Sequence, residues 1–95
     1  MMDALSPEQQ MAALDDLPGW TYDAARKALF RNITLADFSA AFALMTRIAL
    51  AAEQQDHHPE WSNVYNRIDI WLTTHDAGGV SARDVKMAQT IEAFL

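Results

Sequence analysis

The apolar segment between Leu35 and Ala52 constrains the fold of this 95-residue chain more than any other part. Fourteen of its 18 residues are apolar, at the three- and four-residue spacings of an α-helix. An ordinary surface helix has a single apolar stripe. This segment has two, which comprise Leu35, Phe38, Phe42, Met45 and Ala49, and Ala41, Leu44, Ile48 and Ala52. We expect one stripe to pack on a sheet and the other on a second subunit.

Capping signals predict the first two helices. Ser6-Pro7-Glu8-Gln9 provides a capping residue, a proline at the first helical position and a glutamine that completes a capping box. A short helix should run to about Asp15, before the stop signal Leu17-Pro18-Gly19. Thr34-Leu35-Ala36-Asp37 resembles a second cap, with Asp37 also favourable near the positive end of the helix, and the helix that it opens should reach about Gln55.

Alternation of apolar and polar residues predicts a sheet. Trp20–Tyr22 and Leu29–Asn32 are β-prone stretches on either side of a polar, turn-like segment, which indicates a hairpin. Ile68–Thr73 alternates with the period of a half-buried strand. Asn63–Tyr65 belongs to an adjoining strand, with a break before Ile68.

The order of these elements predicts the fold class. Ser81 caps a final helix from Ala82 to about Phe94, so the order is α-β-β-α-β-β-α. This order implies an α+β fold, in which helices pack on one face of a four-stranded antiparallel sheet. No linker or repeat divides residues 1–95, which we expect to form a single domain.

Composition excludes several classes of function. The chain has no cysteine, which excludes thiol catalysis and cysteine-ligated metals. Its net charge of −6 argues against binding to nucleic acid or to an anionic membrane surface. Residues 1–5 lack the basic start of a signal peptide, and no apolar run approaches the roughly 20 residues that span a bilayer. We therefore expect a cytoplasmic protein.

All three histidines lie between positions 57 and 75. His57 and His58 occur where a helix should stop, and His75 occurs where a strand should stop. Small proteins build sites where such element ends meet, and imidazole exchanges protons near neutral pH. Glu53 precedes His57 by four residues, so a helix that continued to His57 would place both on one face.

Other roles for these residues stay open on the sequence pattern alone. A histidine before a proline at a helix end interacts favourably with the helix dipole, and His75 can be a solvated loop residue. Glu53, His57 and His75 would form a three-ligand metal site if the fold gathered them. However, adjacent histidines project in different directions, and the chain has no His-x-x-x-His or His-x-His pair.

The pattern around the histidines resembles the pterin-4a-carbinolamine dehydratase family. The spacing is an acid, three residues, His-His-Pro, five residues, Tyr, nine residues, His, eight residues and Asp. The matching segments are Glu53–Trp61, Asn63–Asn66, Thr73–Asp76, Gly78-Gly79 and Asp84, with further likeness at Gly19-Trp20 and Phe42–Leu50.

The resemblance implies an activity and an assembly. Members of the family eliminate water from 4a-hydroxytetrahydropterin, the product of aromatic amino acid hydroxylases, and so yield quinonoid dihydropterin. They use neither a metal nor a bound cofactor, have the element order given above and form dimers or tetramers. Some animal relatives also stabilise dimers of a homeodomain transcription factor through the central helix, so a non-catalytic interaction module is the alternative.

The resemblance also implies a set of site residues. His57 and His75 correspond to the acid/base pair, His58 mainly holds the pterin, and Glu53 orients or charges a histidine. Asp84 completes the catalytic set. The substrate-binding positions comprise Asp56, His57, His58, Thr73, Thr74, His75 and Asp76.

Overall fold

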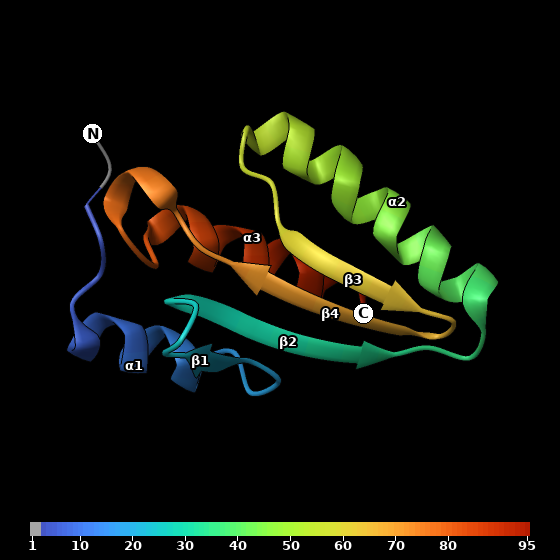
Figure 1. Ribbon diagram of the computed structural model, residues 1–95, viewed down its shortest axis with the longest axis horizontal. Coiled ribbons are helices and arrows are strands. Elements are labelled where there is room, and N and C mark those ends of the chain that lie inside the picture. Colours follow the sequence, from blue (N-terminus) through green and yellow to red (C-terminus); the bar gives the residue numbers. More distant parts are fainter. Residues whose placement is uncertain (1–2) are drawn as a thin grey trace.

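Three α-helices lie on one face of a four-stranded antiparallel sheet in the computed structural model, which describes residues 3–95 (Figure 1). The elements are α1 (Pro7–Asp15), β1 (Thr21–Asp23), β2 (Ala28–Thr34), α2 (Phe38–Gln55), β3 (Glu60–Val64), β4 (Arg67–Leu72), the short 3-10 helix η1 (His75–Ala77) and α3 (Ala82–Phe94). This arrangement confirms the predicted α+β class and the α-β-β-α-β-β-α order. The predicted capping box of Ser6 and Gln9 is also present, at the start of α1.

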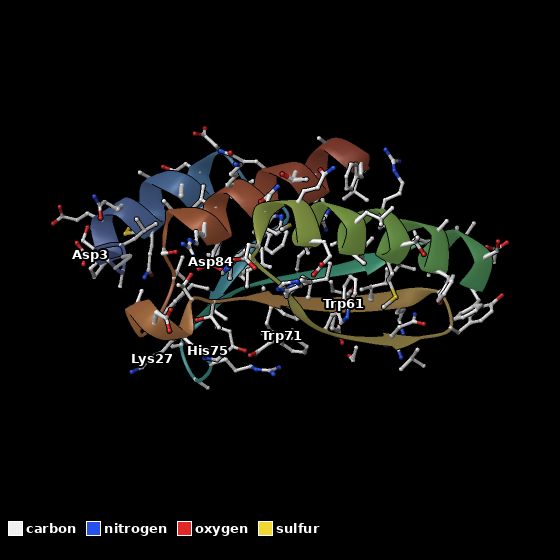
Figure 2. The ribbon with its side chains drawn as sticks, turned by 90° about the horizontal axis from the view of Figure 1, so that it is seen from above. Asp3, Lys27, Trp61, Trp71, His75 and Asp84 are labelled. Atoms are coloured by element: carbon white, nitrogen blue, oxygen red, sulfur yellow. The ribbon has the colours of Figure 1, made fainter. Side chains whose placement is uncertain are left out.

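The sheet has the strand order β1-β2-β4-β3, so β2 and β4 are central. The alternation predicted for β4 sorts its side chains between two faces. Ile68, Ile70 and Leu72 are fully buried under the helices, whereas Trp71 is only half-buried and lies on the face that no helix covers (Figure 2). Strand β4 therefore presents one row of side chains to the core and another to the open face.

The two stripes of α2 have different surroundings, as predicted. Ala41, Leu44 and Ile48 are buried in the core. Phe38 and Phe42 are 47% and 58% exposed, and their rings stack with centroids 5.8 Å apart. The chain by itself therefore buries one stripe, whereas the other is partly buried at Leu35 and Met45 and exposed at its two phenylalanines.

The prediction of a cap at Thr34 before α2 is wrong, although Asp37 does stand at the start of the helix. Asp37 is the N-cap, and its side chain accepts a hydrogen bond from the Ala40 N–H at 2.8 Å. Thr34 instead ends β2, where it pairs with Arg67 of β4. Thr34 is therefore part of a strand rather than a helix cap, and the helix begins after Asp37.

The predictions that the chain has no membrane-spanning segment and no signal peptide concern different parts of the sequence. Among residues 3–95, no helix combines the length and apolar character needed to cross a membrane. Met1 and Met2, which belong to the segment inspected for a signal peptide, lie outside the described residues. A cytoplasmic location stays a prediction.

Candidate active site

A buried carboxylate holds His57 just beyond the end of α2. Asp56 has a left-handed conformation with φ 51°, which ends the helix and turns the chain toward α3. His57 Nε2 lies 2.5 Å from Oδ1 of Asp84, whose side chain is fully buried. Because a carboxylate oxygen only accepts hydrogen bonds, Nε2 carries the proton in this contact and Nδ1 is the other ring nitrogen.

Asp84 also holds the end of β4. Its Oδ2 accepts hydrogen bonds from the Thr74 hydroxyl at 2.8 Å and from the Ser81 N–H at 2.9 Å. The Ser81 contact belongs to a capping box that begins α3. Thr74 immediately precedes His75, so one buried carboxylate ties the His57 segment to the segment that bears His75. No buried side-chain N or O in residues 3–95 lacks a hydrogen-bond partner.

His58 contacts the other predicted carboxylate. Its Nε2 lies 2.5 Å from Glu53 Oε1, and both side chains are exposed. The condition under which Glu53 and His57 would share a helix face is not met, because α2 ends at Gln55 and the turn at Asp56 takes His57 to Asp84 instead. Glu53 does contact a histidine, but it is the next one along the chain.

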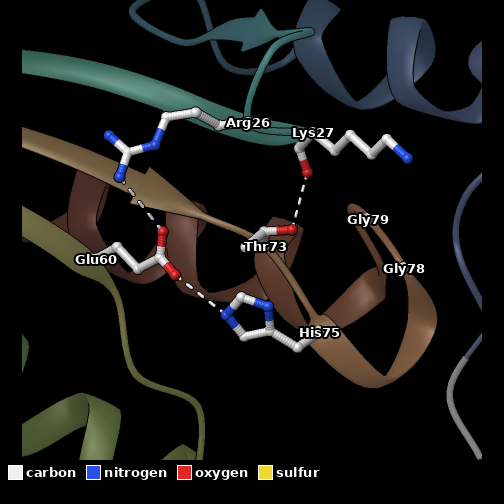
Figure 3. A pocket seen from close by; sticks show the side chains of 7 residues that line it. All are labelled: Arg26, Lys27, Glu60, Thr73, His75, Gly78 and Gly79. Atoms are coloured by element: carbon white, nitrogen blue, oxygen red, sulfur yellow. Dashed lines mark hydrogen bonds and ion pairs between the residues drawn. The ribbon is translucent and has the colours of Figure 1, made fainter.

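His75 lies in η1, and its ring is on the solvent side of the sheet end. Its side chain is 82% exposed, and Nε2 lies 3.1 Å from Oε2 of Glu60. The other oxygen of Glu60 is 3.6 Å from Nη2 of Arg26, in the turn between β1 and β2 (Figure 3). Each of the three histidines is therefore paired with a different carboxylate.

A pocket of about 330 Å³ opens beside His75. Its lining residues are Arg26, Lys27, Glu60, Thr73, His75, Gly78 and Gly79 (Figure 3). Of the predicted site residues, only Thr73 and His75 line it; His57, His58 and Glu53 do not. Arg26, Lys27 and Glu60 were not predicted from the sequence, although Glu60 lies inside the matched segment and Arg26 in the expected turn.

The remaining predicted binding residues differ in their exposure to solvent. Asp56 and Asp76 are exposed. Thr74 is buried, and its N–H donates to the Gly79 carbonyl at 2.9 Å while its hydroxyl donates to Asp84. Within the described range 3–95, no three His, Asp or Glu side chains gather as metal ligands would, so Glu53, His57 and His75 do not form the metal site considered above.

The family model and the sequence relatives that match this chain carry the same family name. The family model described as pterin 4 alpha carbinolamine dehydratase matches residues 3–94. A protein of Rhizorhabdus wittichii, provisionally named pterin-4-alpha-carbinolamine dehydratase, is 63% identical over 98% of this chain and 96% of its own length. A protein of Nitrobacter winogradskyi with the same provisional name is 48% identical over 99% of this chain and 93% of its own.

A solved structure agrees with these sequence relatives. The crystal structure described as transcriptional coactivator/pterin dehydratase from Brucella melitensis superposes with a TM-score of 0.93 and 44% identity. The match covers 96% of this chain and 97% of the Brucella chain. The resemblance inferred from the histidine pattern is thereby confirmed, and the chain belongs to the pterin-4a-carbinolamine dehydratase family.

Proposed function

We propose that this protein is a 4a-hydroxytetrahydropterin dehydratase that acts by histidine acid/base catalysis. The reaction breaks the bond between C4a and the hydroxyl group, takes a proton from N5 and gives a proton to the departing oxygen. Its products are water and quinonoid dihydropterin. Each proton transfer is of the kind that a positioned imidazole accelerates roughly 10²–10⁴-fold. Membership of the family supports the substrate class.

The observation that carries this proposal is the link between His57 and the His75 segment through Asp84. His57 bonds to one oxygen of Asp84, and Thr74, next to His75, bonds to the other. A reaction with one proton donated and one removed needs two such groups at a fixed separation, because the reacting atoms are joined in one small ring. We assign His57 and His75 as that pair.

The other family positions receive supporting roles. His58, which is exposed at the end of α2 and paired with Glu53, would hold the pterin. Asp84 touches no solvent and so would position His57 and Thr74 rather than meet the substrate. Asp56, Thr73 and Asp76 would contribute contacts to the donor and acceptor edge of the ring, with their backbone groups or side chains.

A stopped-flow assay tests the activity. Disappearance of 4a-hydroxytetrahydropterin is followed with and without the protein, in the presence of chelator, for the wild type and for His57→Ala and His75→Ala. We expect acceleration by the wild type and a loss of kcat of about 10²-fold or more in each variant. Wild-type rates in both variants would overturn the acid/base assignment. No acceleration by folded wild type would overturn the dehydratase proposal and favour the non-catalytic module.

We also propose that the exposed stripe of α2 is covered by a second copy of the chain. Phe38 and Phe42 are large, stack on each other and are 47% and 58% exposed, and Leu50 on the same helix is 64% exposed. Contiguous exposed apolar side chains of this kind mark association surfaces. Light scattering should give a dimer or tetramer, and Phe42→Glu should reduce its size. Met11→Glu on α1, where Met11 is 68% exposed, is the control expected to leave it unchanged.

A further inference from the structure

The ring of His75 depends on polar contacts for its orientation. With 82% of its side chain exposed, few neighbouring atoms restrict rotation about its side-chain bonds. The contact within hydrogen-bond distance of the ring is Nε2 to Glu60 Oε2, at 3.1 Å. Figure 3 shows the ring with this nitrogen toward Glu60 and the second nitrogen turned away from it. Whatever fixes Glu60 therefore also fixes His75.

Sheet register places Glu60 where it can reach the ring. Glu60 is the first residue of β3 and pairs with Trp71 of β4, so both side chains project from the open face of the sheet. His75 follows the end of β4 on the same side (Figure 2). Because register is set by the whole strand, this placement does not depend on the flexible ends of either side chain.

Arg26 restrains Glu60 from the other side of the pocket. Its Nη2 lies 3.6 Å from Glu60 Oε1, and its guanidinium carbon lies 3.8 Å from the centroid of the Trp71 ring. Stacking on an indole is a favourable position for a guanidinium group. Arg26 is thus positioned both by its charge partner and by the aromatic ring beneath it.

The turn that carries Arg26 is itself fastened to β4. Asp23 accepts hydrogen bonds from the Arg26 N–H and from Trp71 Nε1, each at 3.1 Å. The Thr73 hydroxyl donates to the Lys27 carbonyl at 2.8 Å. A continuous series of contacts therefore runs from β4 through Asp23, Arg26 and Glu60 to His75.

We propose that Glu60, held by Arg26, is a positioning residue that orients His75 with Nε2 protonated toward Glu60 and Nδ1 toward the substrate. A carboxylate oxygen accepts but does not donate, so the contact selects the ring form in which Nε2 carries hydrogen. Nδ1 is then the nitrogen that exchanges a proton with the pterin. The kinetic consequence rests on the proposed dehydratase function, whereas the orientation of the ring does not.

Glu60→Ala, which removes both acceptor oxygens, tests the orientation directly. In wild type labelled with ¹³C and ¹⁵N at histidine, we expect the order parameter of the His75 ring C–H bonds to be near the roughly 0.85 of rigid backbone. The ¹⁵N shifts should show Nε2 protonated. In Glu60→Ala the order parameter should fall below about 0.6. Glu60→Gln, which keeps one acceptor oxygen, and Arg26→Gln, which keeps the contact between Glu60 and His75, should both lower it less.

The kinetic arm measures kcat and KM separately. Glu60→Ala should lower kcat about tenfold, a part of the roughly 10²–10⁴-fold that a positioned acid or base contributes, with a smaller change in KM. Glu92→Gln is the control for the loss of a negative charge elsewhere. It changes a carboxylate oxygen that lies 2.8 Å from Arg31 Nε and also accepts a hydrogen bond from Trp20 Nε1, and it should change neither the His75 order parameter nor kcat.

The two arms separate the possible failures. A mobile His75 ring in wild type, an unprotonated Nε2, or an unchanged order parameter in Glu60→Ala would overturn the positioning role whatever the activity. An ordered wild-type ring that loosens in Glu60→Ala would support it even if the wild type failed to dehydrate the pterin. Failure of the wild type to dehydrate the pterin would count against the proposed function instead.

Discussion

His57 and His75 stand at the ends of α2 and β4, yet their surroundings are opposite. The side chain of His57 is 9% exposed and bonds to a fully buried carboxylate, whereas that of His75 is 82% exposed and bonds to a carboxylate that is 42% exposed. A buried pair is strongly coupled to folding, because removing either partner strands polar groups away from water. A surface pair contributes little to stability, so its value lies in orientation.

The contrast predicts that the two histidine–carboxylate pairs serve different purposes. Around Asp84 the contacts join α2, β4 and α3, so they build the frame of the site. Around Glu60 the contacts join the β1–β2 turn to His75 in η1, beside the pocket. Changes in the first region should reduce stability and activity together, and changes in the second should reduce activity alone.

The largest effect is expected from Asp84→Ala. The substitution leaves His57 Nε2, the Thr74 hydroxyl and the Ser81 N–H without their acceptor in a buried place. We expect the free energy of unfolding in urea to fall by about 3–5 kcal/mol. Asp84→Asn keeps an acceptor oxygen and a similar volume, and should lose less.

Because association stabilises the folded state, the Asp84 variants and the wild type must be compared at one protein concentration. A loss below about 0.5 kcal/mol, typical of ordinary surface substitutions, would mean that Asp84 is not the anchor of this region. It would also remove the contrast between the two histidine environments.

Thr74→Val should have the next largest effect. Valine has nearly the same shape, but it cannot donate to Asp84 or take part in the 2.7 Å contact between the Thr74 and Ser81 hydroxyls. The unfolding free energy should fall by about 1–3 kcal/mol, the usual result of leaving a buried polar partner unsatisfied. Thr73→Val, which removes the exposed hydrogen bond to Lys27, is the adjacent control and should lose less.

The sequence predicts the frame of the site better than its contacts. The period of β4, the caps at Ser6 and Ser81 and the stop of α2 before Pro59 are local signals, and each corresponds to an element of the structure. The role of Asp84 also has a local signal, because Ser81 and Asp84 have the spacing of a capping box. The resemblance, rather than that spacing, brought Asp84 into the predicted site.

The contacts of the histidines depend on geometry that local patterns do not carry. Asp56 has a left-handed conformation, which ends the helix. As a result His57 contacts Asp84, and Glu53 contacts His58. The pairing of Glu60 with Arg26 joins residues 34 positions apart, and it follows from strand register and the shape of a turn. Whether these residues act on a pterin stays a proposal, since the site residues rest on the resemblance and on the geometry alone.

The pair between Arg26 and Glu60 should contribute much less to stability than the Asp84 network. Both side chains are more than 40% exposed, and the two charged atoms are 3.6 Å apart. A double-mutant cycle with Arg26→Gln and Glu60→Gln should give a coupling of about 0.2–1 kcal/mol in unfolding free energy. It should shrink further in about 1 M salt, where the Debye length is about 3 Å. A coupling of about 3 kcal/mol, the scale of a buried pair, would show that this region is structural too.

The smallest effect on stability is expected from His75→Ala. Its ring has few neighbours to lose and its partner Glu60 retains Arg26, so the unfolding free energy should stay within about 0.5 kcal/mol of wild type. His57→Ala, which strands Asp84, should lose about 3 kcal/mol or more. The two variants are both expected to lose activity, so activity alone cannot distinguish them. If His75→Ala unfolded as readily as His57→Ala, then His75 would belong to the frame of the site, and an exposed ring held by Glu60 for proton transfer would be the wrong description.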